Sequence, residues 1–208
     1  MVLFKLENVS CEQIITYPNL EIKEKIITFI TGESGAGKST LLKLLNGVLT
    51  PTEGAVYYVD KNVLDIDPIE LRRQVLLISQ SAVLFDEESI KENFRVFFNY
   101  RDQAAPSDDE IKGFLRMCSI DLPLESRVYD TSGGEKQRIF IAIHLALGFD
   151  VLMMDEPTSS LDEKNAHALL TNIKAYCKEN DKSLVIISHD KEIVEKFADY
   201  TITLGGKS

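Results

Sequence analysis

The residues Gly32-Glu33-Ser34-Gly35-Ala36-Gly37-Lys38-Ser39-Thr40 decide how the rest of the chain is interpreted, because they match the pattern G-x-x-x-x-G-K-[ST]. A run of β-branched and aromatic residues at 26–31 precedes them, and the strongly helical segment 41–45 follows. Glycines let the backbone turn tightly enough for several N–H groups to point at one phosphate, and the following helix presents its positive end there. Lys38 adds a mobile positive charge, and Ser39 adds a hydroxyl for Mg²⁺. A chance glycine-rich turn would lack this context, so the stretch predicts a phosphate-binding loop.

The composition is that of an ordinary globular domain. The chain has 208 residues, 44% of them hydrophobic and 27% charged, which suits one domain with a sizeable core and room for a small subdomain. The formal net charge of −10 and the pI near 4.9 argue against the basic surface that contact with DNA or RNA requires. We therefore expect no nucleic-acid partner.

The sequence also bears on location and redox state. No segment approaches the roughly 20 apolar residues of a membrane-spanning helix. The longest candidate, 139–149, contains His144 and fits a buried helix better. Residues 1–5 lack the features of a signal peptide, which favours a cytoplasmic location. The cysteines are odd in number and lack metal-ligand spacing, so reduced thiols are expected at Cys11, Cys118 and Cys177.

Helical and extended patterns alternate along most of the chain. Strands are predicted at 2–8, 20–31, 55–59, 75–79, 150–154, 183–188 and 199–204. Helices are predicted at 39–47, 134–147, 162–179 and 190–197, with a short one ending at 71–74. From about 86 to 130 the pattern is helical with breaks at 105–107 and 122–124, which indicates a helical insert. The alternation elsewhere predicts an α/β fold with a mainly parallel sheet and helices on both faces.

An apolar strand ends in two adjacent carboxylates, Asp155 and Glu156. Beside a phosphate loop, Asp155 can hold Mg²⁺ through water. Glu156 faces another direction and can accept a proton from an attacking water. Solvated acids at a strand end are the ordinary explanation, but the upstream loop favours the catalytic one.

A second glycine-rich helix start occurs at 131–138, where Ser132 precedes Gly133 and Gly134. Such a segment suits an anion, although the same residues also make an ordinary helix cap. A chain with one phosphate loop has little use for a second anion site of its own. We therefore expect this segment to serve the nucleotide of a neighbouring molecule.

Five ordered segments together carry a family resemblance. They are the loop at 32–40, Gln80 after the strand 76–79, Ser132-Gly133-Gly134-Glu135, Asp155-Glu156-Pro157-Thr158 followed by Ser159-Ser160-Leu161-Asp162, and Ile186-Ile187-Ser188-His189-Asp190. In this order they resemble the phosphate loop, Q-loop, signature, Walker B strand with D-loop, and switch histidine of the ATP-binding subunit of an ATP-binding cassette (ABC) transporter. The resemblance covers essentially the whole chain.

The resemblance implies a fold and an activity. The fold is a P-loop ATPase of the ABC type over residues 1–208, with a mainly parallel core, an N-terminal antiparallel β region and a helical subdomain at approximately 86–148. The activity is hydrolysis of ATP, with Mg²⁺, by two copies of the chain that enclose two ATP molecules head to tail. Hydrolysis would drive a separate integral membrane permease, which selects the solute. The protein would lie in the cytoplasm, peripheral on the inner face of the cell membrane.

The resemblance also implies residue roles. Glu156 polarises the attacking water, His189 contacts the γ-phosphate, and Gln80 contacts Mg²⁺ and water and senses the membrane partner. Asp162 links the two sites across the dimer. The metal is assigned to Ser39, Gln80 and Asp155. The residues expected to contact ATP are Gly32, Ser34, Gly35, Ala36, Gly37, Lys38, Ser39 and Thr40 of one copy and Ser132, Gly133, Gly134 and Glu135 of the other. His144 and His167 are expected to be core residues.

The sequence departs from the family pattern at three places. The signature begins with Thr131 instead of Leu, and Glu135 replaces Gln, but the serine and glycines remain, so activity should survive. The aromatic residue that stacks on adenine is missing, and Gln13 stands at or near its place. Tyr17 is either its substitute or simply a residue of the sheet. Because stacking contributes only about 1 kcal/mol, weak base selectivity is expected.

The aromatic segment 90–100 follows the Q-loop, in the region that borders the docking groove for the membrane subunit in the family. Phe97 or Phe98 could therefore dock a partner, but aromatic residues at helical spacing equally suit a core.

The alternative function is a soluble ABC-type ATPase in DNA maintenance or translation, without a membrane partner. A DNA-maintenance ATPase needs a long coiled coil between Lys38 and Ser132, and this span has no sustained heptads. A ribosome-associated factor would carry two cassettes and suits an acidic chain poorly. Residues 205–208 directly follow the last predicted strand, so no C-terminal regulatory domain is expected. This chain end and the compact helical insert slightly favour export over import as the direction of transport.

Overall fold

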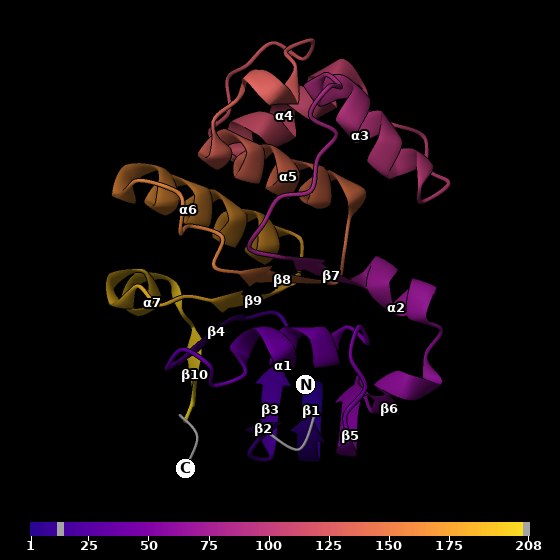
Figure 1. Ribbon diagram of the computed structural model, residues 1–208, viewed down its shortest axis with the longest axis vertical. Helices are drawn as coiled ribbons and strands as arrows, with labels where there is room; N and C mark the ends of the chain where they lie inside the picture. The colour runs from indigo at the N-terminus through magenta and orange to yellow at the C-terminus, as the bar shows by residue number, and fades with distance from the viewer. Residues whose placement is uncertain (12–14, 206–208) are drawn as a thin grey trace. The chain divides into compact units, whose positions relative to one another are not determined.

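The computed structural model describes residues 1–11 and 15–205 of the chain (Figure 1). The chain forms two compact units. The first comprises Met1–Leu77, Phe149–Glu156 and Cys177–Ser208, and the second comprises Ile78–Gly148 and Pro157–Tyr176.

The first unit contains an antiparallel sheet built around β1 (Val2–Cys11). Strand β1 pairs with β2 (Ile15–Thr16), β3 (Leu20–Lys23) and β5 (Glu53–Tyr58), and β5 pairs with β6 (Lys61–Asn62). Buried and exposed residues alternate along much of β3 and β5, as expected when one face of a sheet packs on the core.

The second sheet of this unit has the strand order β10-β4-β9-β8-β7. Its strands are β4 (Ile27–Gly32), β7 (Val75–Ile78), β8 (Val151–Asp155), β9 (Ser183–Ile187) and β10 (Tyr200–Leu204). The pairs β10 with β4, β4 with β9, and β9 with β8 are parallel. The central strands β8 and β9 are almost continuously buried, which is the pattern of a parallel sheet covered on both faces.

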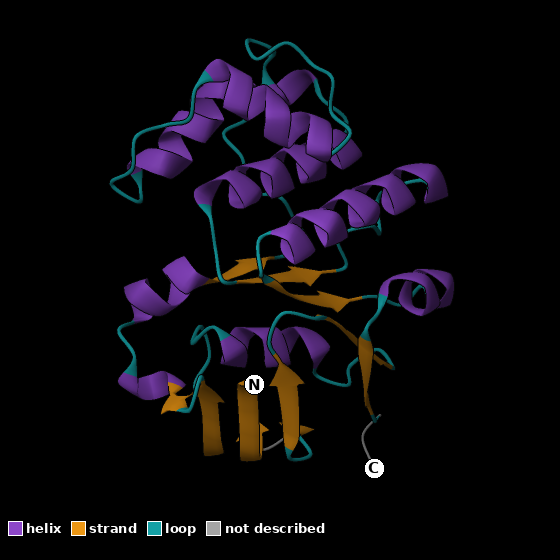
Figure 2. Cartoon of the chain, turned by 180° about the vertical axis from the view of Figure 1, so that it is seen from behind, coloured by secondary structure: helices purple, strands orange, loops and turns teal. Residues whose placement is uncertain are grey.

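Helix α1 (Lys38–Leu45) lies between the two sheets (Figures 1 and 2). It contacts β5 of the antiparallel sheet and both β4 and β8 of the parallel sheet. Its side chains Leu41, Leu42, Leu44 and Leu45 have no exposed area and join the two sheets into one hydrophobic core. The shorter helices of this unit are α2 (Pro68–Gln74), a 3-10 turn at Val63–Asp65 and α7 (Lys191–Phe197).

The second unit is helical. It contains α3 (Ile90–Asn99), α4 (Asp108–Met117), a 3-10 turn at Val128–Asp130, α5 (Gly133–Leu147) and most of α6 (Glu163–Glu179). Helix α5 contacts both α3 and α4, and Asn172 of α6 donates a hydrogen bond to the carbonyl of Met117 over 2.8 Å. Serine side chains cap α3, α4 and α5 at Ser89, Ser107 and Ser132.

The predicted α/β class, with a parallel core and an N-terminal antiparallel region, is confirmed. The single strand predicted at 20–31 is wrong. The structure divides it into β3 and β4, which belong to different sheets. Between them Lys25 has a left-handed backbone with φ +59°, so the chain turns without a glycine or proline. Strands β2 and β6 were not predicted, because two-residue strands leave no periodic pattern.

No helix among residues 1–11 and 15–205 combines the length and the apolar character that crossing a membrane requires. Cys11, Cys118 and Cys177 are all free and buried, in agreement with the expected reduced thiols. Burial raises the pKa of the Cys177 thiol to about 12.

Two aromatic residues of α3, Phe94 and Phe98, are buried in the helical unit, and Phe97 is half-buried. Phe98 is 7% exposed, and the ring of Phe97 makes edge contacts with Phe140 at 5.9 Å and with His144 at 5.8 Å between centroids. His144 is buried on α5, and its Nδ1–H donates to the carbonyl of Phe140 over 2.8 Å. The prediction that His144 is a core residue is confirmed, and His167 is half-buried on α6.

We expect His144 to make the free energy of unfolding depend on pH. Burial lowers its pKa from 6.5 to about 4, so the unfolded chain binds a proton in this range that the folded chain does not. Stability should therefore fall, on the order of 3 kcal/mol, as the pH drops from 6.5 toward 4. His144→Phe should remove this part of the slope in denaturant titrations at several pH values. An unchanged slope in that variant would contradict the assignment.

We expect Gly54→Ala to destabilise the first unit. Gly54 has φ +77°, and a Cβ there would lie 2.3 Å from the carbonyl oxygens of Glu7 and Asn8 in β1. The added strain should cost about 2 kcal/mol or more and lower the melting temperature by several degrees. Gly113→Ala is the matched control, because a Cβ there meets nothing within 4 Å on α4, and it should stabilise by about 0.5–1 kcal/mol. A melting temperature of Gly54→Ala at or above that of the wild type would show that position 54 tolerates a side chain.

Candidate active site

The predicted phosphate loop connects β4 to α1. Strand β4 ends at Gly32, and α1 begins at Lys38 immediately after Gly37. Gly37 has φ +86°, a left-handed backbone that favours glycine. Contact also requires a glycine here, because a Cβ would lie 2.8 Å from the Tyr17 hydroxyl and 2.9 Å from Cγ2 of Ile15. The loop is therefore held closely from the side of β2.

Lys38 carries its charge into the loop itself. The residue is 7% exposed, and its Nζ donates to the carbonyl of Gly32 over 2.9 Å and to that of Glu33 over 2.8 Å. The ammonium group adds a full positive charge to a loop that leads into the positive end of α1, which makes the loop electropositive. This is the environment that a phosphate group requires.

The beginning of α1 is suited to an anion. No described side chain caps its first N–H groups, and its first turn has no acidic residue. By contrast, α3, α4 and α5 each begin with a serine whose hydroxyl accepts a hydrogen bond from the backbone. Uncapped N–H groups at a helix start are available to phosphate oxygens. The hydroxyl of Ser39 and the half-buried Thr40 belong to this first turn.

The predicted catalytic residues follow two adjacent strands of the parallel sheet. Asp155 ends β8 and Glu156 follows it, while Ser188 and His189 follow β9. Because β8, β9 and β4 are adjacent and the pairs β8 with β9 and β9 with β4 are parallel, their carboxyl ends share one edge with the phosphate loop. Ligands of open α/β sheets bind at such an edge.

The structure brings Glu156 and His189 together. Nε2 of His189 lies 3.0 Å from Oε1 of Glu156, and the Glu156 N–H donates to the carbonyl of Ile187 over 3.1 Å. Glu156 has φ +50°, a left-handed conformation that is uncommon for a residue with a side chain. A pocket of about 470 Å³ adjoins this edge and is lined by Gly32, Glu33, Ser188 and His189 among others.

The remaining predicted site residues belong to the helical unit. Gln80 is exposed two residues after β7. Ser132 begins α5 in a capping box: its N–H donates to Oε2 of Glu135 over 2.8 Å, its hydroxyl donates to the same oxygen over 2.7 Å, and the Glu135 N–H donates back to the hydroxyl over 3.3 Å. These hydrogen bonds lower the pKa of Glu135. Gly133 and Gly134 complete the first turn.

The segment at 159–162 lies against the beginning of α5. A Cβ on Gly134 would approach Cδ2 of Leu161 at 3.1 Å and the carbonyl of Ser160 at 3.2 Å, so only glycine fits without adjustment. Asp162 accepts hydrogen bonds from the N–H of Asn165 at 2.9 Å and from its side-chain amide, and these lower the pKa of its carboxyl.

The structure corrects one of the two roles considered for Tyr17. The residue is 3% exposed and its hydroxyl donates to the carbonyl of Gly37 over 2.8 Å, so it is not available to stack on a nucleotide base. Sequence patterns missed this contact, because nothing local links position 17 to position 37. The other position considered for base stacking, Gln13, lies outside the described residues.

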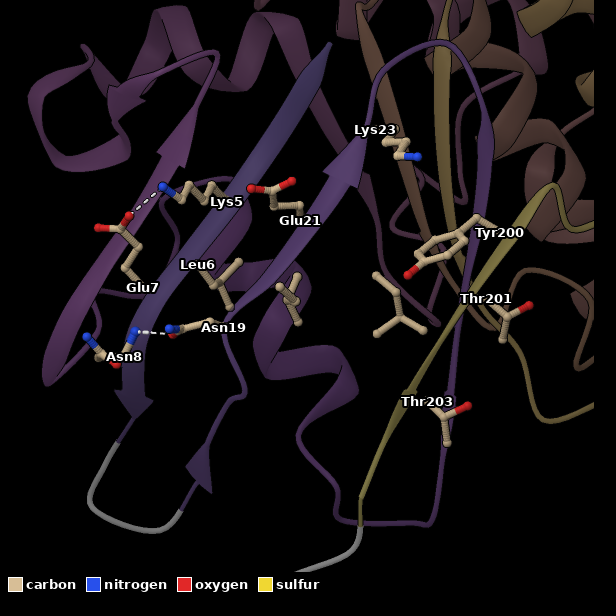
Figure 3. A pocket seen from close by; sticks show the side chains of 12 residues that line it. Lys5, Leu6, Glu7, Asn8, Asn19, Glu21, Lys23, Tyr200, Thr201 and Thr203 are labelled. Carbon is tan, nitrogen blue, oxygen red and sulfur yellow. Dashed lines mark hydrogen bonds and ion pairs between the residues drawn. The ribbon is translucent and has the colours of Figure 1, made fainter.

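A larger pocket of about 940 Å³ is lined by residues outside the phosphate loop (Figure 3). Side chains of β1 and β3 form one side and those of β10 the other, and the ion pair between Lys5 and Glu7 spans 2.6 Å there. It contains none of the predicted site residues, so the volume of a pocket does not identify the site.

Comparisons with known proteins agree with this arrangement. A family model described as ABC transporter matches residues 15–159. The methionine import ATP-binding protein of Clostridium tetani is 31% identical over 206 residues, which cover 97% of this chain but 62% of that protein, so this chain spans less than two thirds of its length. The probable iron export ATP-binding protein of Escherichia coli K12 is 32% identical over 207 residues, covering 97% of this chain and 91% of that protein.

A solved structure is similar over the same range. It is a dimeric post-hydrolysis state of an ATP-binding cassette bound to ADP and Pi, with a TM-score of 0.84 and 29% sequence identity. The match covers 97% of this chain and 94% of that one. The similarity therefore includes both units of the chain.

Proposed function

The chain belongs to the ABC transporter family, and from that premise we propose that it binds and hydrolyses ATP to drive a separate membrane-spanning subunit. The observation that carries the proposal is the shared edge of the parallel sheet, where the buried Lys38 and the uncapped start of α1 adjoin the paired Glu156 and His189. One half of this edge suits a triphosphate and the other half suits activation of a water.

The roles at this edge follow from the chemistry of the side chains. The N–H groups of residues 32–40 and the ammonium of Lys38 bind the phosphates, and Glu156 accepts a proton from the attacking water. His189 holds the Glu156 carboxylate through their 3.0 Å contact, and by family resemblance it would also contact the γ-phosphate. Mg²⁺ prefers oxygen ligands, which the Ser39 hydroxyl, the Asp155 carboxylate and, by family resemblance, Gln80 provide. When bound, it neutralises charge on the phosphates.

The functional form we propose is a dimer of two such chains around two ATP molecules. The signature segment supports this, because the capping box at the start of α5 uses the N–H groups of Ser132 and Glu135 and not those of Gly133 and Gly134, which can receive an anion, although the chain already has one phosphate loop. The related cassette with ADP and Pi is itself dimeric. Each signature then contacts the nucleotide of the partner copy, and Asp162 links the two sites.

The partner is an integral membrane permease on another chain, and the ATPase lies at the cytoplasmic face of the cell membrane. Two observations support this proposal: the described residues contain no membrane-spanning helix, and relatives are named import and export ATP-binding proteins. The transported solute is then selected by the permease. Coupling requires that ATP bind the closed dimer better than the open state.

We expect Glu156→Gln to bind ATP but to lose most hydrolysis. A general base contributes roughly 10²–10⁴ to the rate, so turnover should fall by about 100-fold or more. Because ATP then persists, the variant should accumulate as an ATP-dependent dimer in size-exclusion chromatography. Hydrolysis at the wild-type rate would remove Glu156 from this role.

Lys38→Ala is the control for this experiment. Without the ammonium group in the loop, it should fail to bind ATP and stay monomeric under the same conditions. ATP affinity equal to that of the wild type would contradict the assignment of the phosphate loop.

We expect Ser132→Ala to weaken the ATP-dependent dimer of the Glu156→Gln variant several-fold. The matched control is Ser107→Ala, because Ser107 begins α4 in the same kind of capping box, with its N–H and hydroxyl 2.8 and 2.7 Å from Oε2 of Glu110. Each substitution should cost about 1 kcal/mol of stability through the lost cap, but only the first should affect dimerisation. If both substitutions weakened ATP-dependent dimerisation equally, or if neither weakened it, Ser132 would be excluded from the dimer interface.

A further inference from the structure

We propose that Tyr17 is a positioning residue of the phosphate loop, and that it acts on the phosphates of a bound nucleotide and not on its base. The proposal rests on the proposed binding of ATP at this loop. It concerns the peptide group between Gly37 and Lys38, which Tyr17 holds from the side of the antiparallel sheet.

Tyr17 is itself fixed in place. It immediately follows β2, its N–H donates to the carbonyl of Val9 over 2.8 Å, and its side chain is 3% exposed. Its hydroxyl donates to the carbonyl of Gly37 over 2.8 Å. The last glycine of the loop is thus bound by the hydroxyl of a buried residue.

The carbonyl of Gly37 has two donors. The N–H of Leu41 donates to it over 2.8 Å as the first hydrogen bond of α1, and the Tyr17 hydroxyl donates to it from outside the helix. A carbonyl oxygen has two lone pairs, so both are used. The orientation of this carbonyl is therefore determined by the helix on one side and by Tyr17 on the other.

Peptide planarity carries this restraint to the ligand side. The carbonyl of Gly37 and the N–H of Lys38 belong to the same rigid peptide group and point in opposite directions. When Tyr17 fixes the carbonyl, it also fixes the direction of the Lys38 N–H, the first amide of α1 and a donor available to phosphate. Gly37 has a left-handed backbone, and a glycine can adopt many other conformations. Without the Tyr17 hydroxyl, the peptide group between Gly37 and Lys38 could therefore take another orientation.

The inference predicts an effect that does not depend on the base. Tyr17→Phe removes the hydroxyl and keeps the buried ring. We expect it to weaken binding of ATP, GTP and inorganic tripolyphosphate, each with Mg²⁺, by the same factor of about three to ten, the equivalent of one hydrogen bond. Isothermal titration calorimetry on the full chain measures all three affinities.

Tyr58→Phe is the matched control. Tyr58 is a buried tyrosine of the same unit, on β5, where its ring contacts that of Phe4 with centroids 5.1 Å apart. It lies outside the loop, so its substitution should leave the three affinities unchanged. Thermal unfolding without ligand shows whether either variant alters stability, and the amide ¹H–¹⁵N resonance of Lys38 should shift in Tyr17→Phe but not in Tyr58→Phe.

The possible results separate the explanations. A loss of affinity for ATP and GTP but not for tripolyphosphate would mean that Tyr17 acts on the base or sugar, and it would overturn the proposal. A lower melting temperature with unchanged affinities and an unshifted Lys38 resonance would mean a purely structural role, and it would also overturn it. If the wild-type protein bound none of the three ligands, both this inference and the proposed function would fall.

Discussion

The burial of α1 between two sheets is the constraint on which the first unit depends. Its four leucines have no exposed area, and the helix contacts β5 on one side and β4 and β8 on the other. A helix packed on both sides cannot rotate or slide without opening the core. Its first turn, and the loop that leads into it, therefore have a fixed position relative to the ends of β8 and β9. The geometry of the candidate site follows from this packing before any ligand is bound.

Local patterns were sufficient to predict much of the fold and to propose candidate site residues at strand ends and helix starts. The continuous apolar runs before Gly32 and Asp155 indicated buried parallel strands, and the serine–glycine start at 132–134 indicated a capped helix; all are properties of a few adjacent residues. The turn within 20–31 was missed because Lys25 takes a left-handed backbone, which its residue type does not signal. The contact of Tyr17 with Gly37 joins residues 20 positions apart and leaves no periodic trace.

Helices α4 and α5 begin with the same local motif, although only α5 belongs to the candidate site. Ser107 and Ser132 make nearly identical capping boxes, so a serine cap alone indicates a helix and not a function. The signature segment differs in the two glycines that follow Ser132. A side chain at Gly134 would come close to Leu161 and Ser160. Packing within the helical unit therefore explains why this position is a glycine. Gly133 has open space around its missing Cβ, and packing gives no reason for it.

The backbone of Glu156 has a consequence for how this protein can evolve. A left-handed conformation at a residue with a side chain is strained by on the order of 1 kcal/mol, and it persists here because the N–H of Glu156 is tied to Ile187 and its carboxylate to His189. Glycine would relax the strain but would remove the carboxylate. Thermal stability and catalytic turnover therefore favour different residues at this position. Selection for thermal stability alone would favour loss of the carboxylate and, with it, of hydrolysis.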